Sequence, residues 1–239
     1  MLQINNKIVF VRSKILQILY KYQLRLSRNV NEDKILTFLN KLKPISTNHK
    51  LIRIGSKRDG GYFVPDDLKN ISSLFSAGIG DDANFELELA NKGIKCFMAD
   101  YSIETPPLKH ANFIFTKKFI GAENNQNYIK FSDWFQKNSD SNDHILKIDI
   151  EGDEYDLLPS ITEKQYLKMR IIILEIHFFS NILNILGFAL IKLIFDRLQK
   201  NHEIVHINSN NITAPIKLSK NLILSDQLEI TLLRKDRKI

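Results

Sequence analysis

The sequence has little cysteine, glycine or proline and no long hydrophobic run. Cys96 is the only cysteine in 239 residues, which excludes an internal disulfide or a cysteine-based zinc site and favours a cytoplasmic protein. The most apolar segment, residues 182–195, is interrupted by Asn184 and Lys192, so it falls short of the ~18 apolar residues that a membrane-spanning helix needs. Nine glycines and six prolines exclude collagen-like and low-complexity architectures.

Acidic residues are missing from residues 1–28, which hold six of the lysines and arginines. Because the whole chain has a net charge of +7, the remainder is nearly neutral. A domain that binds nucleic acid needs basic groups along its own surface, so we expect no nucleic-acid partner. The apolar residues of this segment recur at steps of three or four and predict an amphipathic helix: Ile8, Val11, Ile15, Leu19, Tyr22 and Leu26.

The basic helix has two interpretations. It can lie on the anionic inner face of a membrane as a peripheral anchor, or it can pack on the domain as an N-terminal arm. A second helix is expected to begin at Asn31, a good N-cap, and to end before Pro44, with Ile35, Phe38, Leu39 and Leu42 pointing inward. We therefore predict a basic helical extension over residues 1–45 and one main domain over residues 46–239.

The main domain alternates short β-rich runs with helical patterns, which is typical of parallel βαβ units. The expected strands are 72–76, 95–101, 112–120, 144–150, 170–179, 203–208 and 228–234, and the expected helices are 84–92, 131–137, 153–165 and 182–200. The connection between the last two strands lacks a helical pattern. This predicts an α/β, Rossmann-like fold whose seven-stranded sheet is mostly parallel, with an antiparallel last strand and helices on both faces.

A glycine turn follows the first of these strands. Gly78 and Gly80 allow a close backbone approach to a ligand, and Asp100 ends the next strand, where a carboxylate can accept hydrogen bonds from ribose hydroxyls. An ordinary tight turn is the alternative. We predict that a nucleoside-bearing cofactor contacts this region, namely Gly78, Gly80, Asp81, Asp100 and Tyr101, together with Asp149 on a neighbouring strand.

The charges near this turn indicate which cofactor it suits. Asp81 and Asp82 would repel a pyrophosphate at the start of the following helix, and Tyr166 is followed by Arg170 where a Tyr-x-x-x-Lys pair would have lysine. Both features weigh against NAD. S-adenosylmethionine carries adenosine and a sulfonium but no phosphate, and is the expected cofactor.

Ionisable residues also lie at the ends of two later strands. Asp149 and Glu151 share one side of their strand, as do Glu175 and His177, because side chains alternate with a period of two. Such carboxylates must be paired, solvated or bound to a ligand. Salt bridging to Lys147, helix capping or a buried hydrogen-bonded pair would be purely structural explanations.

Several segments together resemble the FkbM-type S-adenosylmethionine-dependent methyltransferases over roughly residues 50–235. They are Arg53-Ile54-Gly55, Asp59-Gly60-Gly61-Tyr62, Ser76-Ala77-Gly78-Ile79-Gly80-Asp81-Asp82, Lys147-Ile148-Asp149-Ile150-Glu151-Gly152, Leu174-Glu175-Ile176-His177 and His206-Ile207-Asn208-Ser209-Asn210-Asn211. The resemblance implies a class I methyltransferase fold and O-methylation of a sugar, glycan or other small hydroxylated molecule. The chain departs from many class I enzymes at Ser76 and Asp82, where those have an acid and a third glycine.

A methyl acceptor with a hydroxyl group must lose a proton, either to a positioned base or because a divalent cation lowers the pKa of the hydroxyl. We expect His177 to be the general base, with Asp149 and Glu175 orienting the acceptor or binding Mg²⁺. The residues expected to contact the acceptor are Tyr62, Glu151, His206 and Asn210. Two other functions stay open: an NAD-dependent oxidoreductase of the same fold, and a catalytically inactive methyltransferase-like protein at a membrane surface.

Overall fold

The computed structural model describes residues 14–15, 17–21, 27–57, 60–210 and 214–237. The amphipathic helix expected within residues 8–26 lies mostly outside these ranges, and stays a prediction. Within them, no helix combines the length and the apolar character needed to cross a membrane.

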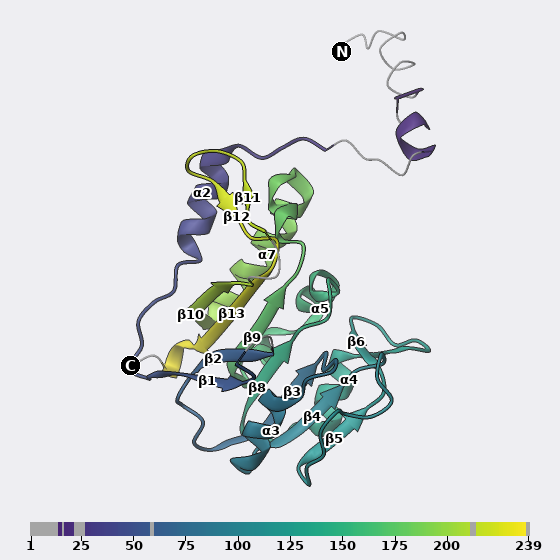
Figure 1. Ribbon diagram of the computed structural model, residues 1–239, viewed down its shortest axis with the longest axis vertical. Coiled ribbons are helices and arrows are strands. Elements are labelled where there is room, and N and C mark those ends of the chain that lie inside the picture. The colour runs from purple at the N-terminus through teal and green to yellow at the C-terminus, as the bar shows by residue number, and fades with distance from the viewer. Residues whose placement is uncertain (1–13, 16, 22–26, 58–59, 211–213, 238–239) are drawn as a thin grey trace.

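The central sheet has seven strands in the order β10-β13-β9-β8-β3-β4-β5 (Figure 1). Their bounds are β3 Ile71–Ala77, β4 Lys95–Ala99, β5 Phe113–Thr116, β8 Asp143–Ile148, β9 Met169–Ile176, β10 His202–Ser209 and β13 Leu228–Arg234. β13 is antiparallel to both of its neighbours, whereas the other pairs are parallel. This confirms the predicted class I methyltransferase sheet with its antiparallel last strand.

Helices cover both faces of the sheet, as expected. One face packs on α2 (Glu32–Lys41), α4 (Phe131–Asn138), α5 (Glu154–Ser160) and α7 (Ile185–Asn201). The other packs on α3 (Asn84–Asn91) and on a hairpin of β1 (Leu51–Gly55) and β2 (Gly61–Pro65). Every residue of β9 is buried, because a central strand of a covered sheet is apolar on both sides.

α2 packs directly on α7. Asn31 caps its first turn, as predicted, and its side chain accepts a hydrogen bond from the Asp33 backbone N–H (2.8 Å). The Phe38 ring meets the rings of Phe188 and Phe195 edge-on, with centroids 5.6 and 6.0 Å apart. Its predicted inward face therefore belongs to the main core, while the division of the chain at residue 45 stays a prediction.

Several predicted elements are wrong in their extent: the strands expected over 95–101, 144–150 and 170–179 end two or three residues early, at 99, 148 and 176. The strand expected over 112–120 ends at Thr116, and Phe119–Gly121 (β6) pairs instead with Tyr128–Lys130 (β7) in a separate small sheet. The helix expected over 153–165 is divided into α5 and α6 (Glu163–Tyr166), because Thr162 caps a new helix shortly after Pro159. The helix expected from 182 begins at 185, after the short helix η1 (Phe179–Leu183), where Asn184 caps it.

Two hairpins were not predicted. The first strand expected from the sequence was 72–76, but Tyr62 lies in β2, which pairs with β1 ahead of it. A second hairpin, β11 (Ile216–Lys217) with β12 (Ile223–Leu224), lies between β10 and β13. The strands of the second hairpin have two residues each, which is too short to show an alternation.

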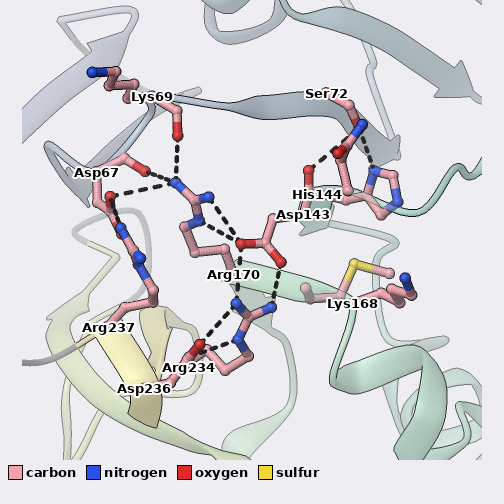
Figure 2. A network of polar contacts seen from close by, with 12 residues as sticks. Asp67, Lys69, Ser72, Asp143, His144, Lys168, Arg170, Arg234, Asp236 and Arg237 are labelled. Carbon is pink, nitrogen blue, oxygen red and sulfur yellow. Dashed lines mark hydrogen bonds and ion pairs between the residues drawn. The ribbon is translucent and has the colours of Figure 1, made fainter.

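An ion-pair network joins the strands at the amino edge of the sheet (Figure 2). Arg170, only 5% exposed, donates from Nε to Asp143 (2.9 Å) and from Nη1 to the backbone oxygen of Asp67 (3.0 Å). Arg234 also donates to Asp143 (2.6 Å), and Arg237 donates to Asp67 (2.8 Å). The network ties β8, β9 and β13 to the segment after β2.

We expect Arg170→Met to destabilise the fold by about 3 kcal/mol, because Asp67 and Asp143 each lose one of their two arginines and the backbone oxygens of Asp67 and Lys69 lose a buried donor. Urea unfolding followed by circular dichroism measures this free energy. Lys200→Ala is the matched control. It removes an exposed ion pair with Glu163 and should cost less than about 1 kcal/mol. Equal losses in the two variants would contradict a structural role for the buried network.

Candidate active site

A cavity of about 990 Å³ opens at the carboxyl ends of β3, β4 and β8. The β1–β2 connection forms one wall, and Phe119 and Tyr128 from the small β6–β7 sheet form another. Of the residues predicted to bind the cofactor, Gly78, Gly80, Asp81, Asp100 and Asp149 line it. The carboxyl edge of a parallel sheet is where ligands bind in such folds.

The two glycines of the turn serve different purposes. Gly78 has a φ of +81°, and a Cβ there would lie 1.6 Å from the carbonyl oxygen of Asp149. Only glycine allows β3 and β8 to end so close together. Gly80 has a φ of +57°, and a Cβ there would meet nothing within 4 Å. Its backbone is therefore accessible to a ligand in the cavity.

Asp100 holds the glycine turn in place. One carboxylate oxygen accepts hydrogen bonds from the backbone N–H groups of Ile79 (2.9 Å) and Gly80 (3.0 Å). The other accepts from the backbone and hydroxyl of Ser102 (2.7 and 2.6 Å). Burial raises the pKa of Asp100, but the hydrogen bonds from Gly80 and Ser102 outweigh it and lower that pKa. An ionised carboxylate thus faces the cavity. Tyr101 is not in the cavity wall, and its ring packs near Phe119 (5.3 Å).

A buried lysine lies beneath the turn. Nζ of Lys147 donates to the carbonyl oxygen of Gly78 (2.9 Å) and lies 3.4 Å from Glu86, which also accepts from Ser76 (2.6 Å). Burial lowers the pKa of Lys147, but the charge of Glu86 overcomes this and raises it. Ser76, at the end of β3, therefore binds an acid supplied by α3.

Tyr62 connects two of the predicted catalytic carboxylates. Its hydroxyl lies 3.1 Å from Asp149 and 3.2 Å from Glu175. Burial, followed by the charges of both carboxylates, raises the pKa of Tyr62, so it remains a hydrogen-bond donor. Glu175 also accepts from Asn210 (2.8 Å) and Gln227 (2.6 Å). Asp149 alone of this group lines the cavity.

His177 does not fit the predicted role of general base. Burial alone lowers its pKa, but the hydrogen bond of Nδ1 to Glu154 (3.1 Å) and the surrounding carboxylates raise the pKa to about 9. The ring is therefore protonated at neutral pH and cannot accept a proton. Its Nε2 lies 2.9 Å from the amide nitrogen of Gln227 and 3.5 Å from the carboxylate of Glu151, and in the protonated ring it can donate only to the carboxylate. His177 lies behind the cavity wall and acts as a cation among acids.

The predicted acceptor contacts and metal ligands lie in different places. Glu151 lines the cavity, whereas Tyr62 and Asn210 lie behind its wall, next to Glu175. His206 contacts the ring of Phe63 (4.9 Å), away from the cavity. Binding of Mg²⁺ by Asp149 and Glu175 stays a prediction without structural support. In the described ranges, the residues whose candidate ligand atoms lie within 4.8 Å of one another are Asp149, Glu151 and His177.

A model of the FkbM methyltransferase domain matches residues 59–202. This match spans more than half of the chain and contains the glycine turn, Asp100 and both acidic strand ends. The chain belongs to the FkbM methyltransferase domain family. The comparison with curated protein sequences gives no match.

The chain also has low similarity to several solved structures. A fibrillarin pre-rRNA processing protein of Methanococcus jannaschii has 10% identity and a TM-score of 0.42, covering 79% of this chain and 83% of its own. A protein described as a methyltransferase of an antibiotic biosynthesis pathway from Anabaena variabilis has 14% identity and a TM-score of 0.29, covering 83% and 69%. We base the fold on the sheet order and not on these likenesses.

Sequence reasoning missed several residues of the FkbM site. Glu154 is hydrogen-bonded to Nδ1 of His177, and the amide of Gln227 donates to Glu175. At the cavity wall, the hydroxyl of Tyr128 donates to Asp153 (2.7 Å). Ser56 reaches the cavity because the β1–β2 hairpin folds over the glycine turn. Two short β-forming runs joined by a glycine-containing loop were the available signal for this hairpin.

We expect Glu154→Gln to lower the pKa of His177 from about 9 towards or below the ordinary value of about 6.5. The substitution keeps the hydrogen bond but removes the main negative charge beside the ring. NMR titration of the imidazole resonances measures the change, with His206 as an internal control. An unchanged pKa would show that Glu154 is not what keeps His177 protonated.

Proposed function

We propose that this FkbM-family methyltransferase transfers a methyl group from S-adenosylmethionine to a hydroxyl of a sugar, glycan or related small molecule. The observation that carries the proposal is the position of Asp149. Its carboxylate is at the cavity wall, one strand away from the glycine turn, and is hydrogen-bonded from behind by Tyr62.

The cavity fits this cofactor in shape and charge. Its volume of about 990 Å³ has room for a nucleoside and an acceptor, since ligand pockets typically span about 300–1,000 Å³. Gly80 offers bare backbone, and Asp100 offers an ionised carboxylate for a ribose. The acids on the wall outnumber Lys57 and Lys147, which suits a cation and opposes a pyrophosphate. When bound, the cofactor supplies a methyl group on a positively charged sulfur.

The residues around Asp149 then have distinct roles. Asp149 accepts the proton of the acceptor hydroxyl, in place of His177. Tyr62 donates to Asp149 or Glu175 and so fixes the orientation of the Asp149 carboxylate. His177 offsets part of the negative charge of Glu151 and Glu154, from which it lies 3.5 and 3.1 Å away. Phe119 and Tyr128, with ring centroids 5.3 Å apart, give the cavity an aromatic wall against which a sugar or adenine ring can pack.

Asp149→Asn should lower kcat by about 10²–10⁴-fold, because a carboxamide keeps the shape of the side chain but cannot accept the proton. Methyl transfer from labelled S-adenosylmethionine to a panel of sugars and polyols measures kcat and KM. Calorimetric titration with S-adenosylhomocysteine should show similar affinity in both proteins.

Glu151→Gln is the matched control on the same wall. It should raise KM for the acceptor with little change in kcat, because it removes an acceptor contact and not the base. Full activity of Asp149→Asn would contradict the proposed role of Asp149. Absence of transfer to any hydroxyl acceptor, with intact cofactor binding, would instead favour another acceptor atom or a binding protein.

A further inference from the structure

Exposed apolar side chains gather at one end of the molecule. Thirteen large hydrophobic side chains are exposed in the described ranges, and six of them lie at the end where α7 begins: Phe178, Ile185, Leu186, Leu193, Leu218 and Ile223. Three more belong to residues 15–20, in the basic segment that precedes this end in the chain. A concentration of this kind marks an interaction surface, because isolated exposed apolar residues would be scattered.

α7 changes character along its length. Its inner side is apolar throughout, as shown by Phe188, Ile191 and Phe195. Its outer side is apolar only over the first half, where Leu186 is 60% and Leu193 is 49% exposed. The second half exposes Asp196 and Lys200 instead. A helix that packs on the core with one side needs no apolar outer side, so the first half requires a separate explanation.

Neighbouring segments complete this surface. The backbone N–H of Ile185 donates to Arg28 (3.1 Å), and that of Val30 donates to Leu183 (2.8 Å). The hydroxyl of Ser219 in the β11–β12 hairpin donates to Glu32 in α2 (2.6 Å). Figure 1 shows α2 and the hairpin at the same end of the molecule, from which the N-terminal segment departs. We call the outer residues of the first half of α7 (185–193), the hairpin (214–225) and segment 27–34 the α7 end.

Basic residues are interspersed among the apolar residues of the α7 end. The hairpin exposes Lys217 and Lys220 beside Leu218 and Ile223, and residues 214–225 contain no acid. Across the α7 end the other cations are Arg28, Lys34 and Lys192, and the acids are Glu32 and Asp33. Lys192 forms an ion pair with Asp196, one turn further along α7. Glu32 already accepts from Ser219. The surface is therefore cationic as well as apolar.

We propose that the α7 end docks on a lipid membrane with anionic headgroups. Leucine and isoleucine side chains enter the boundary between headgroups and acyl chains, while the surrounding lysines attract the headgroups. A second copy of this chain suits the surface less well, because its lysines would face the same cations. Residues 1–28 hold six basic residues and no acid. They join the α7 end at Arg28 and add to its attraction for anionic headgroups.

The directions of the strands relate the α7 end to the cavity. α7 follows β9 through η1, and the hairpin follows β10, so the α7 end lies at the carboxyl edge of the sheet, as does the cavity. Docking through the α7 end would therefore turn the carboxyl edge of the sheet, where the cavity opens, towards the headgroups. The docking itself requires neither the cofactor nor methyl transfer and is tested separately from the proposed function.

Co-sedimentation of the full chain with vesicles tests this proposal. The full chain should bind vesicles of phosphatidylcholine with phosphatidylserine more tightly than vesicles of phosphatidylcholine alone, and high salt should weaken the binding. The double substitution Leu186→Asp with Leu193→Asp should reduce binding by about tenfold or more, because charged groups replace the inserting side chains. Leu167→Asp is the control, since Leu167 is 46% exposed but precedes β9 at the opposite edge.

The double substitution Lys217→Glu with Lys220→Glu is a second, independent variant, on a solvent-facing hairpin. This variant should bind less to the anionic vesicles and equally well to the neutral vesicles. Thermal unfolding checks that each variant is folded. Wild-type binding by both double variants would overturn the proposal and assign any binding to residues 1–26. An equal loss in Leu167→Asp, or no preference for anionic vesicles, would overturn it as well.

Discussion

The close approach of β3 and β8 at Gly78 determines the geometry of the site. The carbonyl oxygen of Asp149 occupies the place where a side chain on residue 78 would begin, 1.6 Å from an added Cβ. Lys147 binds the Gly78 carbonyl from beneath and is itself neutralised by Glu86. Because Asp149 is the next residue after β8, this contact fixes its carboxylate beside the cofactor turn.

The two edges of the sheet differ in how far their carboxylates are paired with cations. At the amino edge, Asp143 and Asp67 are each bound by arginines, which leaves that network with a structural role. At the carboxyl edge, the carboxylates of the described residues that line the cavity outnumber the cations Lys57 and Lys147, and His177 lies behind the wall. The surplus negative charge faces the cavity, where a sulfonium and a hydroxylated acceptor can compensate for it. This difference explains why one edge stabilises the fold and the other can bind ligands.

The central sheet was predictable because long apolar runs such as residues 170–176 have no other stable placement. The ends of the helices were harder to predict. Thr162 and Asn184 cap helices in the structure, but the same residue types also occur in loops without capping anything. Asp149 and Glu151 both line the cavity, but they follow the end of β8 in a turn where Glu151 has a φ of +57° and Ile150 lines the cavity as well. Their position therefore does not result from period-two alternation. The alternation also could not show that Glu175 and His177 lie one layer deeper, because their partners Gln227 and Glu154 come from other elements. His206 was misplaced because it follows an irregularity in the pairing of β10 and packs on β2, a strand the sequence did not reveal.

Calorimetric titration of the full chain with S-adenosylhomocysteine and with NAD⁺ is the most direct test of this account. The glycine turn, the ionised Asp100 and the acidic wall predict saturable binding of S-adenosylhomocysteine, and loss of most of that binding in Asp100→Ala, with no detectable binding of NAD⁺. Binding of NAD⁺ in preference to S-adenosylhomocysteine, or the same affinity for S-adenosylhomocysteine in Asp100→Ala, would contradict it.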